Sequence, residues 1–186
     1  MPDYLERDEM RVGFTEENTR RLGLGWVVAV AWSLSVNAVA ADRRGTTPAF
    51  PQSPDPVLTP GSLCSRPVQK RYAEGIPYCA RDVSSALKKE IMQRYDQVLG
   101  YQVTRMNRQA FKIDHFIPLC MGGSNEPNNL WPQHQSVYTI TDDLEHEACS
   151  KMLQGKMTQA DAVQMIREAK LNLSEASEVL KEIRSR

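Results

Sequence analysis

The chain has 186 residues, a length that suits one domain of ordinary size plus extensions. Lys and Arg together number 23, as do Asp and Glu, so the net charge is zero and the overall balance singles out no partner. The four cysteines include no C-x-x-C pair, which argues against a four-thiolate zinc site. The charge is unevenly distributed, however. Residues 66–112 carry 10 basic and 4 acidic side chains, a surplus of +6 that would attract a polyanion unless it is simply the solvated face of a helix.

The N-terminal segment has the pattern of a secretory signal. Residues 22–40 are uncharged, follow Arg20 and Arg21, and end in the small A-x-A sequence Ala38–Ala40. We therefore predict a signal peptide over residues 1–40, cleaved after Ala40, and a periplasmic or secreted protein. The alternative is an uncleaved anchor in the inner membrane, because 19 uncharged residues are long enough to span a bilayer. Met10 is an alternative start that would shorten the acidic segment before it.

An even number of cysteines in an exported chain indicates disulfide bonds. The four are Cys64, Cys79, Cys120 and Cys149. Three pairings are possible and the sequence does not choose among them. We favour Cys64–Cys79 with Cys120–Cys149, because each pair would join neighbouring segments. The alternative is a set of free, buried thiols that act as small apolar side chains.

Residues 41–62 contain five prolines among Thr, Ser and Gly, a composition typical of an extended linker. We expect the folded domain to cover residues 63–186 and to begin near Cys64. Over residues 83–99 apolar side chains recur every three to four positions, with Ser84 or Ser85 available as a cap and Gly100 placed to end a helix. The expected inner face of this helix consists of Val83, Leu87, Ile91, Tyr95 and Val98.

The second half of the chain combines a short strand with three helices. Residues 109–120 lack helical spacing and predict a strand that enters an irregular loop. The predicted helices are 136–153, Thr158 to about Lys170, and 175–184 with Ser174 as its cap. The inner face of the first is expected to consist of Val137, Ile140 or Thr141, Leu144, Ala148 and Met152, whereas His146 faces solvent. The predicted fold class is α+β with little sheet.

All three histidines lie between residues 115 and 146, and one of them follows an acid in the dipeptide Asp114-His115. Histidine suits general-base work near neutral pH, and a carboxylate is an oxygen ligand for a hard divalent cation. Neighbours in an extended backbone point in opposite directions, so His115 would face water while Asp114 holds a metal. Asn129 would either ligate that metal or pin the intervening loop through its amide. Gly122 and Gly123 allow the turn that returns the chain.

Each of these features is common alone, and the prediction depends on their order within 20 residues. The segment Asp114–Gln133, D-H-x-x-P-L-x-x-G-G-S-N-x-x-x-N-L-W-P-Q, resembles the HNH endonuclease family, in which a β-hairpin and a helix hold one metal ion. The stretches 79–95 and 155–163 are similar to the flanking sequence in one bacterial exported branch, so the resemblance covers about residues 64–170. It implies a small hairpin-plus-helix core surrounded by additional helices.

The resemblance also implies roles for individual residues. Asp114 would bind the metal, His115 would be the general base, and Asn129 would orient the loop or join the metal shell. Many compact members place a metal-binding histidine nine residues after the asparagine, where this chain has Tyr138. We take His134 as its substitute, with His146 and Cys149 as weaker candidates. The cofactor would be one divalent ion, Mg²⁺ before Mn²⁺ or Zn²⁺, with water completing the shell.

The surplus of basic residues would then contact phosphates, through Arg81, Lys88, Arg105 and Arg108. We predict a metal-dependent endonuclease that hydrolyses phosphodiester bonds of nucleic acid, DNA rather than RNA, with little sequence specificity. No small-molecule cofactor is expected. The protein would be associated with a membrane only if the N-terminal segment is uncleaved. Two alternatives remain open: a non-catalytic nucleic-acid-binding module on the same scaffold, and a disulfide-stapled envelope protein in which Asp114, His115 and Asn129 hold a structural ion.

Overall fold

A computed structural model of the chain describes residues 48–186. The predicted signal segment, residues 1–40, therefore lies outside the described residues. The strands are β1 (Gln69–Arg71), β2 (Ile76–Tyr78), β3 (Phe111–His115) and β4 (Leu130–His134). The helices are α1 (Ser85–Leu99), α2 (Gln135–Leu153), α3 (Gln159–Leu171) and α4 (Ala176–Ser185), with short 3₁₀ helices at Val103–Arg105, Arg108–Ala110, Leu119–Met121, Pro127–Asn129 and Leu173–Glu175. The predicted α+β class is confirmed.

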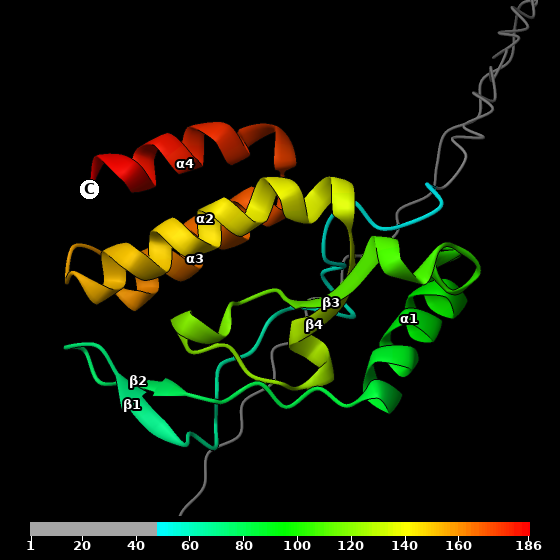
Figure 1. Cartoon of the computed structure of the whole chain (residues 1–186), viewed down its shortest axis with the longest axis horizontal. Helices are drawn as coiled ribbons and strands as arrows, with labels where there is room; N and C mark the ends of the chain where they lie inside the picture. Colours follow the sequence, from blue (N-terminus) through cyan, green and yellow to red (C-terminus); the bar gives the residue numbers. More distant parts are fainter. Residues whose placement is uncertain (1–47) are drawn as a thin grey trace, which may run out of the picture. The chain divides into compact units, whose positions relative to one another are not determined.

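The centre of the fold is the antiparallel hairpin of β3 and β4, which leads without a gap into α2. The hairpin lies between α1 and α2 (Figure 1). A second, separate hairpin, which no sequence pattern predicted, is formed by β1 and β2. Its strands are only three residues long, which leaves too little alternation to detect.

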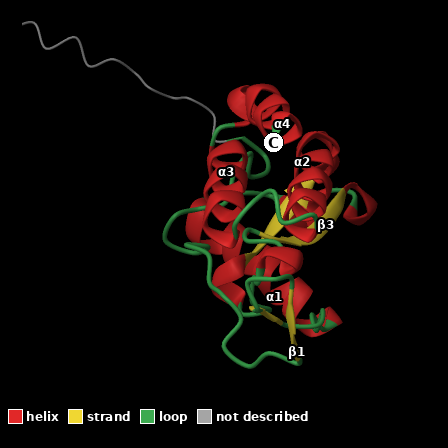
Figure 2. Cartoon of the chain, turned by 90° about the vertical axis from the view of Figure 1, so that its left-hand side faces the viewer, coloured by secondary structure: helices red, strands yellow, loops and turns green. Residues whose placement is uncertain are grey.

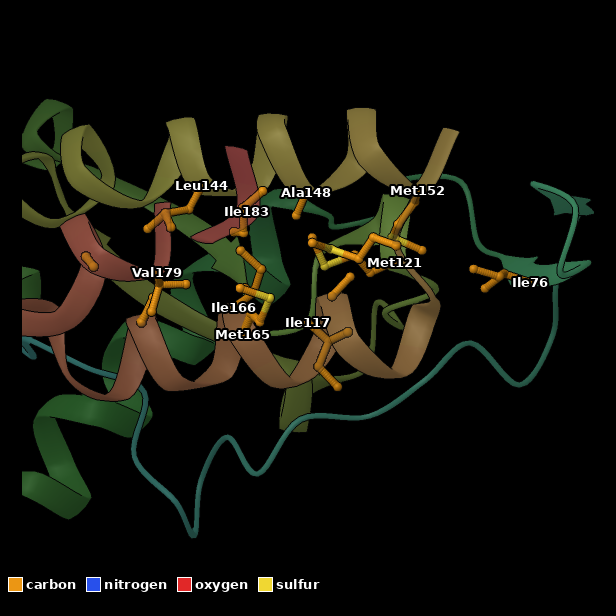
Figure 3. Close-up of a cluster of buried hydrophobic side chains, with 14 residues drawn as sticks. Ile76, Ile117, Met121, Leu144, Ala148, Met152, Met165, Ile166, Val179 and Ile183 are labelled. Atoms are coloured by element: carbon orange, nitrogen blue, oxygen red, sulfur yellow. The ribbon is translucent and has the colours of Figure 1, made fainter. Parts of the chain in front are cut away.

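Two clusters of buried side chains hold these elements together. The first lies between α2, α3 and α4, which pack against one another (Figures 1 and 2). Figure 3 shows Leu144, Ala148 and Met152 of α2 facing Met165 and Ile166 of α3. The second cluster packs α1 against the β3–β4 hairpin through Ile91, Tyr95, Ile113, Leu130 and Trp131. The hairpin also contacts α3 through Asp114 and Lys170, and α2 through Gln133 and Thr141.

The predicted helices form close to their expected bounds. Ser84 caps α1 by accepting a hydrogen bond from the Leu87 amide, and Gly100 ends it in the left-handed conformation at φ 77°. Thr158 caps α3 in the same way through the Asp161 amide. The inner face of α2 is as predicted, with Thr141 rather than Ile140 buried, and His146 is exposed.

Two local predictions are wrong. Val98 of α1 is 61% exposed, and Leu99 packs instead, because a step of four from Tyr95 keeps the helical face better than a step of three here. Ser174 does not cap α4. Its hydroxyl donates to Asn172 Oδ1 within a 3₁₀ turn that precedes the helix.

The linker prediction is also wrong over residues 48–62, which are part of the folded unit. Leu58 and Thr59 are buried, and the Thr59 hydroxyl lies 2.7 Å from Tyr95 Oη and 3.1 Å from the Leu130 carbonyl, to which it donates. The Gly61 amide donates to the Asn128 carbonyl. Proline-rich chain has little conformational freedom to lose, so a few specific contacts are enough to dock it.

Candidate functional site

The register of the hairpin sets the geometry of the Asp-His pair. Asp114 pairs with Trp131 and His115 pairs with Leu130. Successive strand residues point to opposite faces, so the two side chains diverge as expected. Asp114 lies on the face that carries Lys112, toward α2 and α3, and His115 lies on the other. Both side chains are buried.

The imidazole of His115 is held at both nitrogens by side chains from two loops. Arg81 Nη1 lies 3.2 Å from Nδ1, and Asn125 Oδ1 lies 3.0 Å from Nε2. Asn125 is itself anchored, because its Nδ2 donates to the Ala80 carbonyl at 2.7 Å. Arg81 Nη2 donates to the carbonyl of Ile113 at 2.8 Å. Four contacts therefore join the loop before α1, the end of β3 and the loop before β4.

These partners assign the tautomer of His115. A guanidinium has only donors, so the Nδ1 that faces Arg81 must be the acceptor. The proton is then on Nε2, which donates to Asn125 Oδ1. Burial, assisted by the Arg81 charge and opposed by the Asn125 hydrogen bond, lowers the pKa of His115 to about 4. The imidazole is thus neutral at neutral pH and has one basic nitrogen, covered by Arg81.

Asn129 acts as a clamp on the loop between β3 and β4. It is fully buried, its Oδ1 accepts from the Ile117 amide, and its Nδ2 donates to the carbonyls of Ile117 and Ser124. These three bonds are 2.9–3.0 Å long and use both ends of the amide. Of the two predicted roles, the structure shows the loop-pinning one.

The glycine turn is required for the same closure. A Cβ added to Gly123 would lie 1.8 Å from the Ile117 carbonyl oxygen, so no other residue fits there. Gly122 has φ +82° and lets the turn reverse. The loop that presents Asn125 to His115 therefore depends on close backbone contact at Gly123 and on Asn129.

Asp114 is held by ammonium groups. Lys170 Nζ, on α3, lies 2.9 Å from Asp114 Oδ2, and Lys112 Nζ lies 3.5 Å from Oδ1. Lys170 is fully buried, also pairs with Glu145 of α2 at 2.6 Å, and donates to the His115 carbonyl at 2.6 Å. Lys112 bridges to Asp142 of α2. The end of β3 is thus linked to α2 and α3 by an ionic network whose centre, the Lys170–Asp114 pair, is buried.

The network shifts the pKa of each member. Burial opposes ionisation of Asp114, but Lys170 and Lys112 outweigh it and lower the pKa of Asp114. For Glu145 burial prevails over Lys170, and the pKa rises to about 7. The two carboxylates more than offset burial at Lys170 and raise its pKa. Lys170 is therefore a permanent internal cation, whereas Glu145 titrates near neutrality.

The residues predicted to bind a metal do not fit one. His134 pairs with Phe111, three positions from Asp114, and lies on the opposite face of the hairpin. It caps α2 through Nδ1, which accepts from the Ser136 amide, and its ring stacks on Phe50. Asn129 is fully hydrogen-bonded. Among residues 48–186 no three His, Cys, Asp or Glu side chains are grouped to hold an ion.

The substitute ligands are not assembled either. Tyr138 faces the ammonium of Lys112, which lies 4.9 Å from its ring centroid. His146 is exposed on α2, and Cys149 is in a disulfide bond. The cations beside Asp114 in this fold are the ammonium groups of Lys170 and Lys112, so the carboxylate is neutralised without a metal ion.

Both preferred disulfides are present, and all four cysteines are paired. The bonds are Cys64–Cys79 and Cys120–Cys149, with Cα–Cα distances of 5.7 and 6.0 Å. The first holds the segment that leads to Arg81, and the second ties the loop after His115 to α2. Disulfide bonds are typical of proteins from an oxidising, extracytoplasmic compartment. In the described part of the chain no helix is long and apolar enough to cross a bilayer.

The predicted phosphate contacts are distributed over three places. Arg81 lies on His115. Lys88 and Arg108, together with Lys89, line a cavity of about 490 Å³ beside α1. Arg105 lines a different hollow, next to Asp96. A further cavity of about 490 Å³ opens beside Asn125, and its lining includes Ser65, Arg66, Ala80, Asp82 and Glu126.

Three residues at the site were missed from the sequence: Asn125, Glu145 and Lys170. Lys170 had a detectable signal, because it lies four positions after Ile166 on the apolar face of α3, where a charge requires a buried partner. Glu145 directly follows the buried Leu144 and carried only a weak signal. Asn125 belongs to the G-G-S-N sequence, whose residue types are equally typical of an ordinary turn.

We compared the chain with protein families, curated proteins and solved structures. No protein-family model, no curated protein and no solved structure matches this chain.

Proposed function

We propose that this protein is an HNH-type endonuclease, a hydrolase that cuts phosphodiester bonds of nucleic acid, with DNA the expected substrate. The observation that carries the proposal is the environment of His115. A neutral imidazole at the end of a β-hairpin strand has its Nε2–H fixed by Asn125 and its basic Nδ1 turned toward Arg81, an exposed guanidinium. A positioned base next to a phosphate-binding group is what phosphodiester hydrolysis requires.

The scaffold supports the same proposal. A hairpin that runs into a helix, with Asn129 clamping the loop between the strands, is the arrangement implied by the D-H…N resemblance. A cavity opens beside Asn125, the residue that holds His115 Nε2. Lys88, Lys89 and Arg108 provide a second cationic surface for the phosphate backbone, and phosphate contacts carry no sequence information. Little sequence preference is expected.

A plasmid-nicking assay tests this function. The protein is incubated with supercoiled DNA in Mg²⁺, Mn²⁺, Zn²⁺ or EDTA, and His115→Ala is compared with His146→Ala, an exposed histidine on α2. We expect nicking by the parent and by His146→Ala and a loss of at least 100-fold in His115→Ala, in keeping with removal of a general base. Equal activity in His115→Ala would rule out the mechanism. Comparing the reactions in each metal ion with the reaction in EDTA shows whether activity needs an ion. The geometry of the predicted ligands does not favour such a need.

The second candidate is a non-catalytic nucleic-acid-binding module. It is favoured by two observations: both nitrogens of His115 are occupied, and among the described residues the predicted metal ligands are not brought together. Such a protein would retard DNA in a gel without cutting it under any of the metal conditions.

For localisation, the two disulfides and the A-x-A sequence support export to the periplasm or beyond. N-terminal sequencing of the protein from the producing cells would identify Ala41 as the first residue.

A further inference from the structure

Arg81 is an exposed side chain whose guanidinium covers a buried imidazole. His115 is 3% exposed, and the one basic nitrogen it has, Nδ1, faces Arg81 Nη1 at 3.2 Å. A nitrogen cannot deprotonate water while its lone pair accepts a hydrogen bond from another donor. If His115 is the base, the guanidinium must leave Nδ1 before the reaction.

The backbone that carries Arg81 is firmly held, whereas its side chain is not. The Ala80 carbonyl accepts from Asn125, and Cys79 is bonded to Cys64, whose amide donates to the Gly122 carbonyl. The guanidinium itself has two neutral partners, His115 Nδ1 and the Ile113 carbonyl. No carboxylate of the described residues pairs with Arg81. The side chain can therefore turn without losing an ion pair.

A phosphate is a stronger partner for a guanidinium than either of these groups. Charge-assisted, bidentate hydrogen bonds to a phosphate are roughly twice as strong as bonds between neutral groups, and Arg is suited to them. The Nε2 side of the ring would not be disturbed, because Asn125 is anchored separately on Ala80. Withdrawal of Arg81 would thus free Nδ1 alone and leave the ring oriented.

We propose that Arg81 is a cap displaced by substrate: a nucleic-acid phosphate draws the guanidinium off His115 Nδ1, so that the base becomes available only when substrate is bound. This inference rests on the proposed nuclease function. In the step that follows, Nδ1 takes a proton from water while the water oxygen bonds to phosphorus. The P–O3′ bond breaks, its electron pair stays on O3′, and solvent supplies the proton that O3′ needs. Arg81 holds the phosphate throughout and is a binding residue rather than the base.

The test is ¹⁵N NMR of the imidazoles in the full protein, since the chain has only three histidines. The probe is a short phosphorothioate DNA oligonucleotide, which is cut slowly. We expect the Nδ1 resonance of His115 to move on saturation toward its position in the free Arg81→Met variant, with Nε2 still protonated. His134 and His146 serve as internal references and should not move. If the oligonucleotide binds and the His115 Nδ1 resonance does not move, the proposal that Arg81 is a displaceable cap is overturned. Failure of the oligonucleotide to bind would overturn it as well.

Kinetics give an independent readout. Arg81→Met should raise KM for DNA by about 10- to 100-fold, as expected for loss of a hydrogen bond to a charged group. It should change kcat by less than about threefold, because His115 Nδ1 is already free in this variant. Arg184→Met, which removes a guanidinium paired with Glu147 on the far helix α4, is the matched control and should change neither. A fall in kcat with KM unchanged would overturn the cap. Displacement of Arg81 without any nicking would refute the nuclease proposal alone, and nicking with Nδ1 unmoved would refute the cap alone.

Discussion

Lys170 Nζ lies 2.9 Å from Asp114 Oδ2, although the two residues are 56 positions apart in the chain, and both side chains are buried. The same ammonium donates to the carbonyl of His115. One lysine of α3 therefore fixes the side chain and the backbone at the end of β3, next to the proposed base. It also pairs with the carboxylate that was predicted from the sequence to bind a metal ion.

Replacing Lys170 by Met should destabilise the fold strongly. The substitution leaves the buried carboxylate of Asp114 and the partly exposed carboxylate of Glu145 without their shared cation, and breaking a buried ion pair in this way costs about 3–5 kcal/mol. Urea unfolding monitored by circular dichroism measures the loss. Lys181→Met, at a residue 72% exposed, should change stability by less than about 0.5 kcal/mol. The double variant Asp114→Asn with Lys170→Met should recover part of the loss. If Lys170→Met is as stable as the parent, the network is not structural.

The pH dependence of stability should reveal two opposing groups. The pKa of His115 falls from 6.5 to about 4 on folding, so the unfolded chain binds the proton more tightly and stability is lost as pH falls below 6.5. The pKa of Glu145 rises from 4.5 to about 7, so the folded chain binds the proton more tightly and stability is lost as pH rises above 4.5. Between pH 4.5 and 6.5 the two effects oppose each other.

Two variants separate these effects. In Glu145→Gln only the His115 contribution remains, and stability should rise by roughly 3 kcal/mol between pH 4 and pH 6.5. In His115→Gln only the Glu145 contribution remains, and stability should fall as pH rises from 4.5 to about 7. Thermal unfolding across this range measures both slopes. Parallel pH profiles for the two variants would contradict the assignment.

The loop between β3 and β4 should tolerate no substitution at Asn129 or at Gly123. Asn129→Ala leaves the amide of Ile117 and two carbonyls buried without partners, at a cost of about 2–4 kcal/mol. Gly123→Ala should be at least as damaging, because its Cβ would overlap the Ile117 carbonyl. Asn128→Ala is the control. Its exposed side chain accepts from the Ser62 hydroxyl, and the cost should stay below about 1 kcal/mol. Differential scanning calorimetry ranks the three.

Removal of divalent ions should leave the fold intact. Asp114 is neutralised by Lys170 and Lys112, and Asn129 is fully bonded within the chain. The Tm in EDTA should therefore match the Tm in Mg²⁺, Mn²⁺ or Zn²⁺ within about 1 °C, since a stabilising ion would shift it by mass action. A Tm that falls in EDTA and recovers with one of these ions would support the alternative of a structural ion in an envelope protein. That result would also mean that Lys112 or Lys170 moves away from Asp114.

Much of the architecture could be predicted because it depends on local patterns. The 3.6-residue spacing from Val137 to Met152 defines the buried face of α2, and capping residues such as Ser84 and Thr158 mark helix starts. The segment 48–62 could not be predicted in this way. Its docking depends on Thr59 meeting Tyr95 and Leu130, residues far away in the sequence, and composition alone made it an extended linker.

The sequence by itself determined that Asp114 and His115 diverge from one strand, that Gly122 and Gly123 turn the chain, and that Asn129 is placed to return to the loop, because strand alternation and turn chemistry are local rules. Only the tertiary structure decided what each side chain meets. It placed the Lys170 ammonium on Asp114, Arg81 and Asn125 on His115, and His134 at the far end of the hairpin. These contacts depend on helix packing, loop closure and strand register, which bring distant residues within hydrogen-bonding distance and which no local pattern encodes.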